Sequence, residues 1–161
     1  MEDNNKQNAV NALLAEYTKA VHELQNLIVD IRPQELVKIT DQYTSDPQCK
    51  SIQKVLTHVV SSGYSYCVYI QNLKGPGILR PAEIERSSAA EYIKDLDELL
   101  TYTQTHFANI QDTDLEEFDE EKKIKTAWGQ SYDIEQIMEH AIVHILRHRR
   151  QIERFKILIG N

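Results

Sequence analysis

Four segments of the chain each carry an apolar stripe with helical periodicity, and this pattern limits the folds available to it. They span residues 5–31, 51–73, 88–110 and 133–159. In each segment apolar residues recur at spacings of three and four, which places them along one face of an α-helix, and in the second segment this stripe includes Gly63 and ends at Leu73. Four amphipathic helices whose stripes match in period bury them best against one another. The sequence therefore predicts an all-α fold, a four-helix bundle, and a single domain over residues 1–161.

Local signals mark the ends of these helices. Pro33 is expected to end the first helix, because proline disfavours the helical conformation in the residue before it. Ser51 is expected to cap the second helix, and the Lys-Gly-Pro-Gly stretch at 74–77 to stop it. Asp133 and Gln136 have the spacing of a capping box at the start of the fourth helix. These boundaries depend on neighbouring residues alone.

Two of the connections are long. Residues 33–50 join the first and second helices, and we expect a short helical turn after Pro33 and a cover over one end of the core. Residues 111–132 join the third and fourth helices and begin with an acidic run, which we interpret as a solvated loop. A short extended segment is expected at 124–127.

Charge and hydropathy exclude several functional classes. The formal net charge of −7 argues against a nucleic-acid-binding protein, which would carry a basic surface. The one basic run, residues 147–154, includes Glu153 and is interpreted as the solvated side of a helix. No apolar stretch is long enough to span a membrane, and the polar first thirty residues do not resemble a signal peptide, so we expect a cytoplasmic protein. Cys49 and Cys67 are too few and too far apart for a thiolate cluster or a disulfide framework, and Cys67 is expected in the core.

The histidines of the fourth helix differ in their orientation. At 100° per residue, His148 lies about 20° from the centre of the buried stripe, His144 about 60° and His140 about 100°. Two imidazoles one turn apart on an apolar face need partners, because each unpaired nitrogen costs roughly 1–3 kcal/mol when buried. A divalent metal ion satisfies both, since neutral imidazole is a good ligand for zinc, nickel or iron.

A third histidine, His58, lies on the flank of the second helix's stripe. Three protein ligands plus water form the usual open coordination of a catalytic metal, and in bundles such sites are built from facing helices. The alternative is that these histidines are satisfied core or boundary residues, and spacing alone leaves both interpretations open. His22 lies beside its stripe and is expected at the surface or the boundary, and His106 lies about 100° from the centre of its stripe and is expected to be exposed to solvent.

Three short motifs, in order along the chain, resemble those of a known family. The second helix begins with Ser51 and reaches Leu56-Thr57-His58, a Ser-capped start that ends in Leu-x-His. Trp128-Gly129 precedes the last helix, which carries a His-x-x-x-His-Arg-x-Gln pattern from His144 to Gln151. Together they resemble the DinB-like superfamily, which includes the bacillithiol S-transferases and the mycothiol-dependent maleylpyruvate isomerases. Arg150 departs from the family's usual glycine, which puts close packing at that point in doubt but not the ligands.

The resemblance implies an up-down-down-up bundle with a divalent metal ion, nickel or zinc, held by His58, His144 and His148. It also implies a metal-dependent thiol S-transferase, or a related hydrolase, that acts on a small-molecule thiol such as bacillithiol and on an electrophile, and it implies a homodimer. Gln151 and Tyr66 are candidates for substrate binding, and no catalytic residue is assigned. The alternative function is a non-catalytic metal-binding or partner-binding bundle of the stress-response type.

Overall fold

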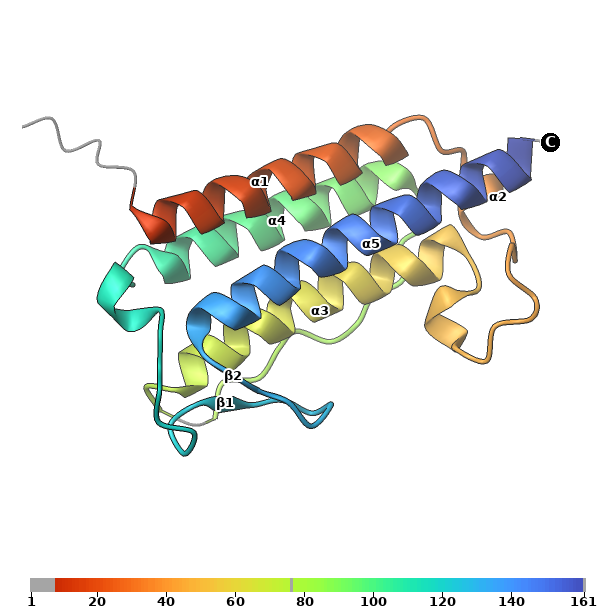
Figure 1. Ribbon diagram of the computed structural model, residues 1–161. Coiled ribbons are helices and arrows are strands. Elements are labelled where there is room, and N and C mark those ends of the chain that lie inside the picture. Colours follow the sequence, from red (N-terminus) through yellow and green to blue (C-terminus); the bar gives the residue numbers. More distant parts are fainter. Residues whose placement is uncertain (1–7, 76, 161) are drawn as a thin grey trace, which may run out of the picture.

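Four long helices form the bundle that the periodicity predicts. The computed structural model describes residues 8–75 and 77–160. The long helices are α1 (Ala9–Ile28), α3 (Ile52–Asn72), α4 (Ala89–Phe107) and α5 (Ile134–Gly160). In Figure 1, α1 and α5 run in one direction and α3 and α4 in the other. The all-α bundle of up-down-down-up type is therefore confirmed, while residues 5–7 of the predicted first helix lie outside the described residues.

Side-chain caps start each long helix. Asn8, Ser51 and Ser88 each accept a hydrogen bond from a backbone N–H in the first turn of α1, α3 and α4 respectively. At the start of α5 the Asp133 carboxylate accepts from Gln136 N at 2.8 Å, and the Gln136 amide oxygen accepts from Asp133 N at 3.0 Å. The predicted Ser51 cap and the capping box are both confirmed.

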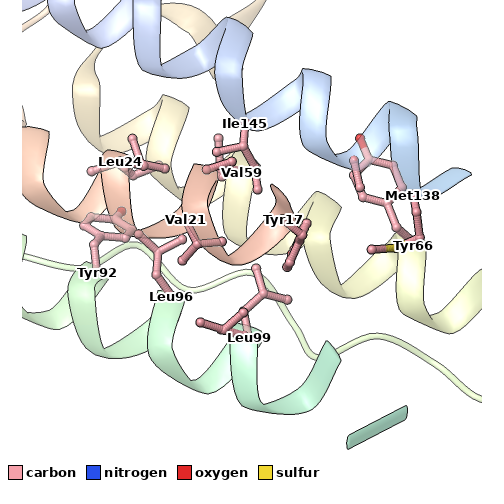
Figure 2. Close-up of a cluster of buried hydrophobic side chains, with 14 of the residues drawn as sticks. Tyr17, Val21, Leu24, Val59, Tyr66, Tyr92, Leu96, Leu99, Met138 and Ile145 are labelled. Atoms are coloured by element: carbon pink, nitrogen blue, oxygen red, sulfur yellow. The ribbon is translucent and has the colours of Figure 1, made fainter. Parts of the chain in front are cut away.

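The core lies between the four long helices. Each of α1 and α3 packs against both α4 and α5, so the helices form a ring in the order α1, α5, α3, α4. Figure 2 shows side chains from all four meeting in the centre of the bundle. Fully or nearly fully buried members of this cluster are Tyr17, Val21, Leu24, Val59, Leu96, Leu99 and Ile145. Cys67 is buried among them, as expected.

The first long connection covers one end of the bundle. It contains the short helix α2 (Pro33–Leu36), which was expected after Pro33, and the 3-10 turn η1 (Pro47–Cys49). Leu36 is fully buried, which holds the connection against the core. The first helix itself ends at Ile28, earlier than residue 31, because Ile31 N already donates to Ile28 O in a tighter turn.

The connection between α3 and α4 spans the length of the bundle. Because both helices run in the same direction, the chain must return along the whole bundle between them, as Figure 1 shows. Leu73, predicted to belong to the buried stripe, is 45% exposed. That prediction is wrong because α3 ends at Asn72, and Leu73 is its C-cap at the start of an exposed stretch that includes Lys74 and Gly75.

The second long connection holds a small hairpin and a helix cap. Strands β1 (Ile124–Lys125) and β2 (Ser131–Tyr132) pair antiparallel, so the expected extended segment has a partner that the sequence did not reveal. Gly129 in the turn has a φ of +85°, a conformation that favours glycine. In the acidic run, η2 (Asp112–Asp114) places the Asp112 carboxylate 3.1 Å from both Ala9 N and Val10 N at the start of α1. Within residues 8–75 and 77–160, no helix is long and apolar enough to cross a membrane.

Candidate metal centre

Three imidazoles converge between α3 and α5. His58 comes from α3, and His144 and His148 are one turn apart on α5. The Nε2 atom of His144 lies 2.9 Å from Nε2 of His58 and 3.2 Å from Nε2 of His148. One ligand atom from each histidine falls within 4.8 Å of the other two. The structure thus brings together the three side chains that the sequence selects.

A hydrogen bond sets the tautomer of His148. Its Nδ1 lies 2.8 Å from Oε1 of Gln151, and because an amide oxygen only accepts, Nδ1 carries the proton. The Nε2 atom of neutral His148 therefore presents a lone pair toward His144. This arrangement, with the far ring nitrogen held by an oxygen acceptor, is typical of metal-binding histidines.

Hydrogen bonds among the three neutral rings cannot satisfy all three of their Nε2 atoms. Both short contacts meet at Nε2 of His144, and with His148 presenting a lone pair, neutral tautomers can place a proton in only one of them. The other contact then has no hydrogen bond, which leaves one Nε2 lone pair of the cluster unpaired. Two nitrogen ligands about 2.0–2.1 Å from a zinc ion lie about 2.9–3.4 Å apart at octahedral or tetrahedral angles. The donor set and its spacing therefore fit a divalent metal ion.

Burial keeps these imidazoles neutral. Desolvation, followed by the neighbouring histidines, lowers the pKa of His144 to about 3. Burial also lowers the pKa of His58, with a smaller contribution from His148. For His148 burial lowers the pKa, and the hydrogen bond to Gln151 opposes that change. Neutral imidazole is the form that binds metal, so the site is ready for an ion near neutral pH.

An aromatic pocket of about 500 Å³ opens on one side of the cluster, and His58 and His144 are part of its wall. Tyr66 stands edge-on to His144, with ring centroids 5.7 Å apart. Trp128, the only tryptophan in the sequence, stacks on His140 at 5.1 Å. The hydroxyl of Tyr69 accepts a hydrogen bond from Ala127 N at 2.8 Å, which fixes the hairpin turn over the pocket.

A second cleft, of about 580 Å³, lies on the other side and includes His148 and Gln151 in its wall. It separates α5 from the connection that contains α2 and η1, which contributes Asp41 and Cys49. The three histidines therefore lie between two cavities of different character.

The remaining histidines lie outside the cluster. His22 and His106 are exposed, as expected. His140 is half-buried against Trp128, with its ring centroid 6.4 Å from that of His144, and it does not join the three converging nitrogens. The angles on α5 correctly predict that His148 is the buried one, whereas His144 and His140 are both half-buried.

Sequence reasoning missed two features of the site. The oxygen that accepts the hydrogen bond from His148 belongs to Gln151, one turn along α5, which the sequence marked only as a candidate for substrate binding. The aromatic wall was also missed, although Trp128 stands in the motif before α5 and stacks on His140.

A scan of protein-family models matches residues 1–155 to the model described as the DinB family. Searches among curated proteins and among solved structures found no match.

Proposed function

The chain belongs to the DinB family, as its motifs predict, and we propose that it is a divalent-metal-dependent thiol S-transferase or a related hydrolase. His58, His144 and His148 are the proposed ligands. The observation that carries the proposal is the convergence of their three Nε2 atoms with the tautomer of His148 set by Gln151.

His58, His144 and His148 would hold a nickel or zinc ion, which would supply Lewis acidity that lowers the pKa of a bound thiol and so favours the thiolate near neutral pH. In the transfer, the sulfur forms the new bond to the carbon of the electrophile. The leaving group departs with its bonding electron pair, and the proton of the thiol passes to solvent.

The protein supplies a position for the electrophile. The aromatic pocket beside His58 and His144 suits a flat or apolar electrophile, because Tyr66 and Trp128 present ring edges and faces to it. Burial raises the pKa of Tyr66, so its phenol stays protonated and is available as a hydrogen-bond donor rather than a base.

Metal content tests the ligands. Protein purified without a histidine tag is expected to carry close to one nickel or zinc ion per chain by elemental analysis. The His58→Ala/His144→Ala variant is expected to lose it, because one imidazole does not hold such an ion alone. His22→Ala/His106→Ala is the matched control and is expected to keep it. Wild-type protein that binds no metal after reconstitution would rule out the proposal.

Turnover tests the reaction. The metal-loaded protein is to be assayed with chlorodinitrobenzene and each of four thiols: bacillithiol, cysteine, coenzyme A and glutathione. Release of chloride with at least one thiol, absent in the double-histidine variant, is the expected result. Silence with all four, in protein that holds its metal, would leave hydrolysis or metal binding without catalysis as the function.

A further inference from the structure

Three arginines line the cleft on the His148 side of the cluster. Arg147, Arg150 and Arg154 are spaced by three and four residues on α5, so they share one face of the helix. All three are exposed at the rim of the cleft, whose wall also contains His148 and Gln151. The basic run that resembled an ordinary solvated helix face therefore borders the candidate metal centre.

These arginines lack the carboxylate partners that the others have. Arg32, Arg80, Arg86 and Arg149 each pair with an acidic side chain. Among the residues that the structure describes, no carboxylate lies within ion-pair distance of Arg147, Arg150 or Arg154. By contrast, Arg149 on the same helix forms an ion pair with Glu23 of α1.

The clustering of these three arginines is unfavourable for the stability of the protein when no anion is bound. Like charges three or four residues apart on a helix repel one another and destabilise it. The chain as a whole carries a formal charge of −7, so acidic residues are plentiful, yet in the cleft wall only Asp41 carries a carboxylate. Burial raises the pKa of the Cys49 thiol, which therefore adds no negative charge to the cleft. A local conflict of this kind without structural compensation is typical of a binding site.

We propose that Arg147, Arg150 and Arg154 form an anion-binding subsite of the candidate metal centre, which takes a carboxylate or phosphate group of the substrate. Guanidinium groups bind both kinds of anion in a bidentate manner. The ligand's anionic group lies against the arginine face of α5, and its thiol extends past Gln151 toward His148. As a substrate subsite this inference rests on the proposed function, but binding of the anion requires no turnover.

Two pairs of thiols test the subsite by calorimetric titration of the zinc-loaded protein. Mercaptosuccinate carries two carboxylates that thioglycerol lacks, and coenzyme A carries phosphates that pantetheine lacks. In wild-type protein at low salt, the anionic member of at least one pair is expected to bind about tenfold more tightly than its neutral partner. The pair that responds identifies carboxylate or phosphate as the anion.

Arg150→Gln/Arg154→Gln is expected to reduce this preference to below about threefold while leaving the neutral thiols unchanged. Lys94→Gln/Lys122→Gln removes the same charge from exposed positions outside the cleft and is the matched control. Titration of metal-free wild-type protein with inorganic phosphate or succinate measures the subsite without the metal, and the arginine variant is expected to weaken whichever anion binds.

The outcomes separate the two proposals. Anionic and neutral thiols that bind equally to wild-type protein would overturn the subsite, even if the protein transfers thiols. If the lysine control lost as much of the preference as the arginine variant, the subsite would also be overturned, because the effect would then come from the overall charge of the protein. If the arginine-dependent preference is present but no thiol is transferred, the subsite stands and the transferase function fails.

Discussion

At the scale of single residues, the imidazoles are distinguished by what holds each ring. His148 donates from Nδ1 to Gln151, whereas the buried Nδ1 of His144 has no hydrogen-bond partner among the described residues. Helical angles predict which histidines point inward, but they do not predict this hydrogen bond, which depends on side-chain rotamers. Substrate contact by Gln151 or Tyr66 stays a prediction, and the structure adds a positioning role for Gln151.

Replacing Gln151 tests that role. Gln151→Ala removes the acceptor of the Nδ1 proton, and zinc affinity is expected to fall about 10–100-fold, measured by competition with a chromophoric chelator. Gln151→Glu is expected to restore the affinity, because a carboxylate accepts the same hydrogen bond. Gln104→Ala, the same substitution at an exposed position of α4, serves as the control. Unchanged affinity in Gln151→Ala would show that packing alone orients His148.

At the scale of helices, α4 makes a close contact with α3, which carries His58, and an ion pair with the return segment that leads into α4. Gly63 allows α3 to approach α4, since a Cβ atom there would lie within 3.2 Å of Cγ, Cδ1 and Cδ2 of Leu99. Arg86 makes two hydrogen bonds of 2.8 Å to Asp95 at the start of α4, which fixes the end of the long return segment. The sequence predicts Gly63 as a stripe residue but not the closeness of the contact, and it does not reveal Asp95 as buried.

Gly63→Ala is expected to destabilise the protein by about 1–3 kcal/mol, because Leu99 is fully buried and cannot move away freely. Urea unfolding monitored by circular dichroism measures this change. Gly160 is a helical glycine with open space around it, so the control variant Gly160→Ala is expected to be neutral or slightly stabilising. Equal stability of the two variants would contradict the tight α3–α4 contact.

At the scale of the whole molecule, periodicity and caps were enough to predict the bundle, since both are local properties of the sequence. Ser51 and the Asp133–Gln136 pair mark helix starts correctly because a cap involves only neighbouring residues. The β1–β2 pairing, the return segment after Leu73 and the two cavities were not predicted, because each depends on how distant segments meet. The convergence of the three proposed ligands could be predicted because His58, His144 and His148 lie on helices whose buried faces are evident from periodicity.

Acid is expected to destabilise the metal-free protein through the buried histidines. In the unfolded chain histidine titrates near 6.5, whereas burial lowers the pKa of His144 to about 3 in the folded protein. Below pH 6.5 the unfolded chain binds a proton that the folded chain does not. The free energy of unfolding therefore falls by up to about 1.4 kcal/mol per pH unit for this residue as pH drops toward 3.

Urea midpoints of the metal-free protein at pH 7.5, 6, 5 and 4 measure this dependence. His144→Leu is expected to flatten the fall, because the variant has no imidazole to protonate, whereas His106→Ala is expected to leave it unchanged. The comparison separates the histidine from carboxylates, which are common to all three proteins. A fall that is as steep in His144→Leu as in wild type would contradict the prediction.

Because the proposed ligands are divided between α3 and α5, they become available at different times while the chain is synthesised. His58 leaves the ribosome early, while His144 and His148 belong to the last of the four helices to be synthesised. A nascent chain that ends before α5 carries only one of the three proposed ligands, His58. A metal ion held by all three imidazoles therefore requires α5 to dock on α3, and its presence would mark a bundle in which these two helices are assembled.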